Sequence, residues 1–252
     1  MSARHRNRVL GAPIDLLDMR ETLAAVVTHV ENGVPGAHLG VNAANLIMAR
    51  EEPGYLADLD EADLVTADGQ SVVWGARLRG LRVPARVAGI DLMLALLDES
   101  RRRGWSVFLL GARPSVVAAL ADRLARDGIR VAGHRDGYLD AASWPGAVAA
   151  VRASGARLLF VGMPSPAKER LIIGFARPGG IPFSVGVGGS FDVLSGERRR
   201  APGWVQRIGL EWLARLVQEP RRLAGRYVLT NTRFLWLLAS DAVLGRGRRR
   251  RR

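Results

Sequence analysis

The chain has 252 residues, 48% of them apolar and 24% charged, which indicates a globular protein with one large domain, or one domain plus an extension. It contains no cysteine, so disulfides, thiolate metal sites and cysteine nucleophiles are excluded. The formal net charge of +13 favours an anionic partner.

The chain begins with a basic segment that lacks an apolar stretch of signal-peptide length, so we do not expect secretion. Apolar segments then alternate with amphipathic ones. Strands are predicted at residues 38–41, 64–66, 106–110, 129–131, 158–161 and 183–187, and helices at about 18–31, 43–51, 70–79, 90–103, 114–127, 141–153 and 166–176. This alternation predicts an α/β fold, with a Rossmann-like, mainly parallel sheet flanked by helices.

Several predicted strands run directly into glycine, at Gly111, at Gly162 and from Gly186 to Gly189. In an open α/β sheet, ligands lie beyond the carboxyl ends of the strands, where glycine lets the backbone approach a phosphate. Each of these glycines could equally form a tight turn between a strand and a helix. Together they favour a nucleotide-type ligand.

After Asp192 the pattern changes to two predicted helices, at 203–218 and 220–241, with no further strand. We therefore expect an α/β catalytic domain over residues 1–197 and a basic helical appendage over 198–252. Residues 198–252 hold 15 arginines against Glu211, Glu219 and Asp241, a balance of +12, which leaves +1 for residues 1–197.

Aromatic and basic residues on amphipathic helices are typical of a membrane interface, where arginines meet anionic headgroups. Tryptophans packed on the core, with solvated arginines around them, would explain the same pattern. The longest apolar window near the C-terminus, residues 234–244, is interrupted by Ser240 and Asp241 and is shorter than the roughly 20 residues that a spanning helix needs.

Most standard chemistries find no support in the sequence. The four histidines are scattered without metal-ligand spacing, and the pair Asp58-Leu59-Asp60 lies in a helical pattern, where residues two apart point in different directions. The Gly-x-Ser-x-Gly motif of a nucleophilic serine and the phosphate-binding P-loop are absent, and the Gly-x-Gly-x-x-Gly motif of dinucleotide-binding folds is incomplete. We therefore expect metal-independent chemistry that uses carboxylates and arginines, and no cofactor.

Three carboxylates occupy suggestive positions. Asp68 ends a strand and so points into the crevice, which suits a general base, although Asp-Gly is also a common turn. Asp91 opens a helix and Asp192 follows the glycine-rich strand, and either could simply cap a helix. Lys168 is the only lysine among 37 basic residues, which hints at a specific role for a compact charge, although chance retention is as good an explanation.

Several motifs resemble the WecG/TagA/CpsF family of bacterial glycosyltransferases, glycosyltransferase family 26, from about Asn42 to Arg226. They are Asn42-Ala43, Ala67-Asp68-Gly69, Gly89-Ile90-Asp91, Phe108-Leu-Leu-Gly111, Gly137-Tyr138, Val161-Gly-Met-Pro-Ser-Pro166-Ala-Lys-Glu169, Gly186-Val-Gly-Gly-Ser-Phe-Asp192, Arg200-Ala-Pro202-Gly-Trp204, Gly209-Leu-Glu211-Trp212 and Glu219-Pro220-Arg221. The last three, taken together, are the most specific.

The resemblance implies an inverting, metal-independent hexosyltransferase. Such an enzyme passes a sugar, N-acetylmannosamine or a related hexose or uronic acid, from a UDP-sugar to a polyprenyl-diphosphate-linked sugar during the synthesis of polymers such as exopolysaccharide or teichoic acid. It works as a peripheral protein on the cytoplasmic face of the membrane, against anionic lipid. Nucleic acid is then not an expected partner, and a homo-oligomer is left open.

The resemblance also assigns residue roles. Asp68 matches the proposed general base, and the expected substrate-binding set is Asn42, Arg86, Asp91, Tyr138, Lys168, Glu169, Gly188, Gly189 and Asp192. The appendage is expected to bring Arg200, Arg215 and Arg221 to the acceptor diphosphate and the membrane. Two departures put the transferred sugar in question: Gly40 replaces the usual threonine, and Lys168 replaces a glutamine.

Two other functions fit the sequence. A nucleic-acid-binding protein would use the basic C-terminus and would show a steep salt dependence of binding. A non-catalytic family member would bind a UDP-sugar without turnover, an alternative that Gly40 and Lys168 keep open.

Overall fold

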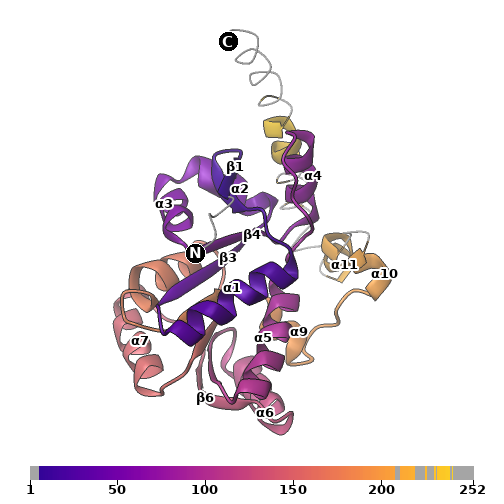
Figure 1. Ribbon diagram of the computed structural model, residues 1–252. Helices are drawn as coiled ribbons and strands as arrows, with labels where there is room; N and C mark the ends of the chain where they lie inside the picture. The colour runs from indigo at the N-terminus through magenta and orange to yellow at the C-terminus, as the bar shows by residue number, and fades with distance from the viewer. Residues whose placement is uncertain are drawn as a thin grey trace.

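A six-stranded parallel sheet forms the centre of the molecule in the computed structural model (Figure 1), which describes residues 6–207, 211–218, 225, 230, 232–238 and 240. The strand order is β4-β3-β8-β7-β5-β6. Its strands are β3 (Gly36–Val41), β4 (Leu64–Ala67), β5 (Ser106–Gly111), β6 (Arg130–Arg135), β7 (Leu158–Gly162) and β8 (Phe183–Gly186). All six coincide with strands predicted from the sequence, so the predicted α/β class is confirmed.

Helices cover both faces of the sheet and divide the core into two apolar clusters. One face packs against α1 (Met19–Asn32), α5 (Gly89–Arg103), α6 (Pro114–Arg126) and α9 (Ser190–Leu194). The other face packs against α2 (Ala43–Glu51), α3 (Pro53–Glu61), α4 (Gln70–Leu78), α7 (Trp144–Ala153) and α8 (Ala167–Leu171). Short helical turns precede α7 at Ala141–Ser143 and extend α8 as a π-helix at Ile172–Ala176.

The predicted helices begin and end close to the observed ones because their signals are local. Asp18 caps α1 by accepting a hydrogen bond from the Glu21 amide, and Gly33 ends the helix in the left-handed conformation. The same logic holds for α5, which ends at Gly104 with a positive φ of 68°.

An N-terminal hairpin, β1 (Arg6–Val9) and β2 (Ala12–Asp15), was not predicted. Its turn places both Leu10 (φ 51°) and Gly11 (φ 94°) in the positive-φ region. The Asp15 carboxylate receives two hydrogen bonds from Arg6, at 2.9 and 2.8 Å, and one from the Val65 amide at 2.7 Å. The hairpin is thereby fastened to β4, an edge strand of the sheet.

The C-terminal region contributes α10 (Gly203–Arg207), α11 (Glu211–Gln218) and a helical stretch at residues 232–238, called here the C-terminal helix. Phe234 and Leu237 are buried in the same apolar cluster as α2 and α4, so this helix packs directly on the α/β unit. Arg221, the side chains of Trp204 and Arg215, and most of the predicted helix at 220–241 lie outside the described residues. Within the described part of the chain, no helix is long and apolar enough to cross a membrane.

Candidate active site

Asn42 and Asp68 follow the neighbouring strands β3 and β4 and meet at the carboxyl edge of the sheet. A Cβ atom added to Gly69 would lie 3.1 Å from the Asn42 Cβ, so the turn after Asp68 sits directly against Asn42. The Asn42 Oδ1 accepts hydrogen bonds from the amides of Ala44 (2.9 Å) and Asn45 (3.3 Å). Asn42 is therefore the N-cap of α2, and its carbonyl oxygen is engaged in that role.

The Asp68 carboxylate is half-buried and held on one side only. Its Oδ1 accepts a hydrogen bond of 2.9 Å from the Gly89 amide at the start of α5, and its own amide donates to the Val41 carbonyl at 2.9 Å. No hydrogen bond from the residues that the structure describes reaches Oδ2. The backbone thus fixes the carboxylate in place and leaves one oxygen available.

Gly40 lies beside this carboxylate. A Cβ atom at position 40 would lie 3.1 Å from the Asp68 Cβ and 3.8 Å from Oδ2, and the first of these distances is tighter than most real Cβ contacts. The departure from threonine noted in the sequence therefore concerns the immediate neighbour of Asp68.

Four charged side chains form a chain of ion pairs next to Asp68, at the start of α5. Arg200 Nη2 lies 2.6 Å from Asp91 Oδ1, and Arg200 Nε lies 3.4 Å from Glu211 Oε1. The second oxygen of Glu211 lies 2.6 Å from Arg86 Nη1. The structure thus brings together three of the predicted residues, Arg86, Asp91 and Arg200.

Glu211 belongs to one of the sequence motifs but had no predicted role. Its carboxylate is mostly buried and bridges two guanidinium groups, from the loop before α5 and from the segment after α9. Arg200 is 11 residues away in the sequence and Arg86 is far more distant, so no local pattern indicates that Glu211 joins them.

Lys168 and Glu169, two further predicted substrate-binding residues, are buried. Lys168 is 6% exposed and Glu169 is fully buried, and Lys168 Nζ lies 3.0 Å from Glu169 Oε1. The same oxygen accepts hydrogen bonds from Ser165 Oγ (2.8 Å) and Tyr55 (3.1 Å). A Cβ at Gly186 would come within 2.9 Å of Lys168 Cδ, so the aliphatic part of the lysine side chain packs against the last residue of β8.

Asn45 links this buried group to the crevice. Its amide nitrogen donates to Tyr55 Oη at 2.7 Å and to Ser165 Oγ at 3.1 Å, while its carbonyl oxygen accepts from the Asn42 amide at 3.1 Å. Burial and the charge of Glu169 raise the pKa of Tyr55 far above its usual value, so its hydroxyl stays protonated as a donor. Through Asn45, this buried hydrogen-bond network holds the backbone of Asn42 in place.

His38, on β3, lies in the interior of the sheet. It is fully buried, and its Nε2 lies 2.8 Å from Thr66 Oγ1. Burial, followed by the charge of Lys168, lowers the pKa of His38 to about 3, so the ring is neutral.

The glycine-rich strand ends serve two different purposes. A Cβ at Gly111 would lie 2.5 Å from the Gly162 carbonyl, and one at Gly137 would lie 2.9 Å from the Gly111 Cα. These glycines let β5, β7 and the loop after β6 pack closely. The loop after β8 is more open: Gly188 has a φ of 52°, and a Cβ there would meet nothing within 4 Å.

Two further predicted substrate-binding residues follow β8 and β6. Asp192 lies in the first turn of α9, and a Cβ at Gly189 would lie 3.8 Å from its Oδ2. Tyr138, in the loop after β6, is 74% exposed, and its amide donates to Asp136 Oδ1 at 3.0 Å. Their roles toward a ligand remain predictions.

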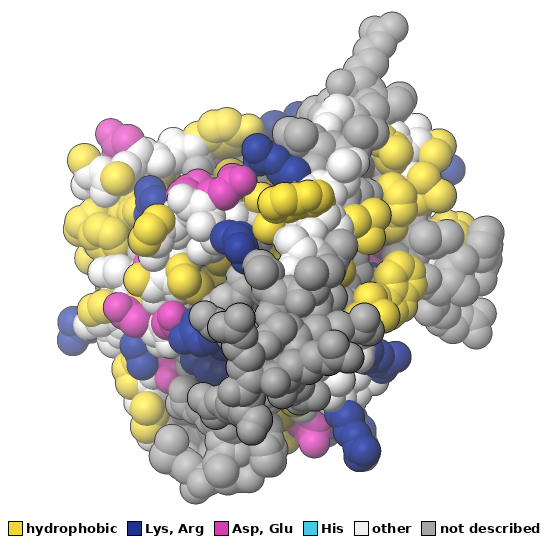
Figure 2. Space-filling model, turned by 90° about the horizontal axis from the view of Figure 1, so that it is seen from above, with side chains coloured by type: hydrophobic (Ala, Val, Ile, Leu, Met, Phe, Trp, Pro, Cys, Tyr) yellow, Lys and Arg dark blue, Asp and Glu magenta, His cyan; other side chains and the backbone are white. Residues whose placement is uncertain are grey.

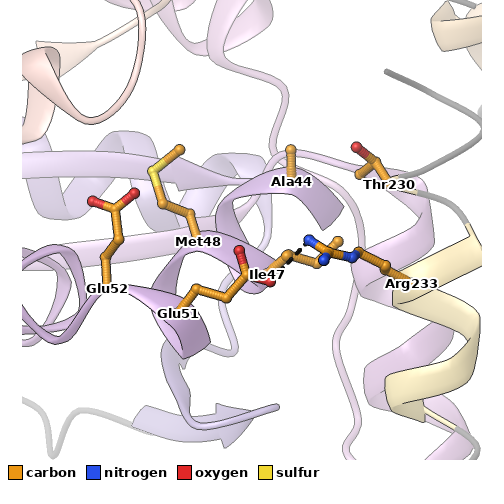
Figure 3. Close-up of a pocket in the computed structure, with 7 residues that line it drawn as sticks. All are labelled: Ala44, Ile47, Met48, Glu51, Glu52, Thr230 and Arg233. Carbon is orange, nitrogen blue, oxygen red and sulfur yellow. Dashed lines mark hydrogen bonds and ion pairs between the residues drawn. The ribbon is translucent and has the colours of Figure 1, made fainter. Parts of the chain in front are cut away.

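A separate pocket of about 190 Å³ lies between α2 and the C-terminal helix (Figure 3). Ala44, Ile47 and Met48 supply apolar walls, and Arg233 Nη1 donates to Glu51 Oε1 at 3.0 Å across its rim. Asp68 is not among its lining residues. Among the described residues, no group of three or more histidine or acidic side chains could hold a metal ion.

Comparison with known families gives a match that spans nearly the whole chain. The family described as "Glycosyl transferase WecG/TagA/CpsF family" matches residues 7–248. The matched range includes nearly all of the hairpin, the complete sheet, Asp68 and Glu211.

Proposed function

The chain belongs to the WecG/TagA/CpsF family of glycosyltransferases, and we propose that it moves a sugar from a UDP-sugar to a polyprenyl-diphosphate-linked acceptor. In this proposal it acts on the inner face of the cell membrane, and the transferred sugar is N-acetylmannosamine or a related hexose or uronic acid. The family supports glycosyl transfer in polysaccharide synthesis; the donor, the acceptor and the place are the proposed part.

The observation that carries the proposal is the one-sided anchoring of Asp68. With Oδ1 held by the Gly89 amide, the open Oδ2 is free to take a proton from the acceptor hydroxyl. That oxygen of the acceptor then forms a bond to the anomeric carbon while the bond from this carbon to the UDP oxygen breaks. UDP leaves with the electron pair, and attack from the opposite face inverts the configuration.

The negative charge of the leaving UDP needs a counterpart, and we propose that Arg86 and Arg200 supply it. Both lie beside the α5 turn that holds Asp68, and both are bound to carboxylates. Two guanidinium groups that share one carboxylate have the geometry of an anion site, because guanidinium binds carboxylate and phosphate in similar ways. We propose that Glu211 occupies the place of the donor diphosphate and exchanges with it.

The position of Lys168 bears on the identity of the sugar. Its ammonium group is engaged by Glu169 inside the protein, so its positive charge is already compensated. We therefore assign Lys168 the support of β8 and the glycine loop, through its contact with Gly186. A preference for an anionic sugar would then have to come from other residues.

The test combines a donor screen with one substitution. A panel of UDP-sugars is incubated with a short lipid-diphosphate acceptor, and glycosylated lipid and released UDP are measured. Asp68→Asn keeps the size of the side chain and the hydrogen bond from Gly89, so we expect UDP binding to be retained and transfer to fall by about 10²–10⁴-fold. Substantial transfer by this variant would exclude Asp68 as the base, and no transfer by the unmodified protein with any donor would contradict the proposal.

A further inference from the structure

Apolar side chains are exposed mainly on one group of helices. Of the ten large hydrophobic side chains that are exposed in the described residues, seven lie on α4, on α11 or in the C-terminal helix: Trp74, Leu78, Trp212, Leu213, Val217, Leu235 and Trp236. The membrane-facing surface expected from the sequence lay within residues 198–252. Trp74 and Leu78 lie outside that range, within the α/β unit.

On α4 these two side chains form a short apolar stripe. Trp74 and Leu78 are four residues apart, which places them on the same side of the helix, and they are 49% and 82% exposed. A single exposed leucine is ordinary, but here it is next to Trp74 and near the exposed residues of the C-terminal helix, and contiguous exposed apolar surface marks a contact site.

The charged residues in the sequence around this stripe are all basic. Between Asp68 and Asp91 the chain has four arginines and no acidic residue. Arg77 and Arg82 are exposed around the end of α4, and Arg77 donates to the carbonyls of Val83 and Pro84, neutral acceptors that close the following loop. Residues 1–197 carry only +1 in total, so this cluster is a local concentration of positive charge that the total conceals.

The C-terminal helix extends the same surface. A Cβ at Gly75 would lie 3.0 Å from Leu238 and 3.2 Å from Phe234, so α4 and this helix are in direct contact (Figure 1). Phe234 and Leu237 face the core while Leu235 and Trp236 are exposed, so the helix is apolar on both sides. Thr232 and Arg233 are exposed on the same helix, so its outward side combines apolar and polar residues, as is typical of a helix at a membrane interface. Seen from this end, apolar and basic side chains lie close together on the described surface (Figure 2).

We infer that the end of α4 is a membrane-inserting element of the α/β unit, which places Trp74 and Leu78 among lipid tails and its arginines among anionic headgroups. The combination of tryptophan, leucine and arginine at a helix end fits the boundary between headgroups and acyl chains. A second protein chain as the occupant would need acidic side chains opposite the exposed Arg77 and Arg82, whereas anionic lipid supplies that charge at every point. The inference rests on the proposed function only in that the acceptor is a membrane lipid.

The absence of cysteine makes a direct test available. Leu78→Cys and, as a matched control, Val34→Cys give full-length proteins with a single thiol for an environment-sensitive fluorophore. Val34 is 52% exposed and lies before the amino end of β3, at the opposite edge of the sheet from Asp68. Both proteins are mixed with phosphatidylcholine vesicles with or without phosphatidylglycerol.

We expect the emission of the label at position 78 to shift to the blue, and its quenching by iodide to fall, only with phosphatidylglycerol present, while the label at 34 does not respond. In cosedimentation, Leu78→Asp should weaken binding to these vesicles about tenfold, as loss of a buried leucine predicts, and Val34→Asp should leave it unchanged.

Vesicle binding without a response at position 78 would overturn the inference, because the contact would then lie elsewhere. A blue shift that depends on protein concentration in the absence of lipid would also overturn it, in favour of a second copy of the chain. Transfer to a water-soluble acceptor, measured in parallel, separates this result from the proposed function: an enzyme inactive with every donor whose label at 78 still responds would contradict only the latter.

Discussion

Replacing Glu211 with glutamine tests whether this side chain holds the place of the donor diphosphate. The substitution keeps the size of the side chain and removes the charge that holds Arg86 at 2.6 Å and Arg200 at 3.4 Å. If Glu211 competes with the ligand, Glu211→Gln should bind UDP more tightly than the unmodified protein, because the ligand no longer has to displace a carboxylate.

The size of the effect follows from the two ion pairs. The three side chains are between 15% and 23% exposed, so each pair is partly screened and contributes about 0.5–1 kcal/mol. Removal of both lowers the dissociation constant for UDP by about 5–30-fold, since about 1.4 kcal/mol corresponds to a factor of ten. Inorganic pyrophosphate should show the same trend, because the exchange concerns the diphosphate.

Isothermal titration of UDP into each protein, at low and at high salt, measures this change. Glu197→Gln is the control, since it also removes the charge from an ion pair of 2.6 Å, with Arg113, and leaves the pairs of Arg86 and Arg200 unchanged. An unchanged or weaker affinity for UDP in Glu211→Gln, with the control unchanged, would refute the exchange and leave Glu211 as a docking contact of α11.

Two further predictions concern the surroundings of Asp68 and the interior of the sheet. Gly40→Ala places a Cβ 3.1 Å from the Asp68 Cβ, so we expect kcat to fall several-fold with little change in KM for the donor; unchanged kinetics would show that the carboxylate has room to move. The lowered pKa of His38, about 3 in the folded protein against 6.5 when exposed, means that the unfolded chain binds the extra proton first. Stability should therefore fall by up to about 1.4 kcal/mol per pH unit as pH drops below 6.5 towards 3. In urea titrations, His38→Asn should reduce the loss of unfolding free energy between pH 6.5 and 3, and replacement of the exposed His134 should not. The same loss of stability in both variants and in the unmodified protein would contradict the assignment.

Much of the fold could be predicted because its signals are short-range. Strand–helix alternation and caps such as Asp18 act within a few residues, so sequence patterns alone are enough to put Asp68 at the end of a strand. The hairpin was missed because Leu10-Gly11 is not one of the usual tight-turn pairs and Pro13 argues against a strand.

The candidate site was harder to predict where partners are distant in the sequence. Lys168 and Glu169 follow a proline at the start of a helix, a local pattern typical of an exposed position. Their burial depends on Tyr55, which is 114 residues from Glu169 along the chain. The bridge by Glu211 likewise joins segments that no local pattern relates.

The length of α4 has a consequence for where the chemistry takes place. The helix begins at Gln70, two residues after Asp68, and its rise puts Trp74 about 6 Å and Leu78 about 12 Å along the helix axis from that start. If that end rests in the interface, α4 acts as a spacer that fixes the height of the base above the acyl chains. A lipid-linked diphosphate and its first sugar must bridge that gap, so the helix would select acceptors by how far their reactive hydroxyl stands from the membrane.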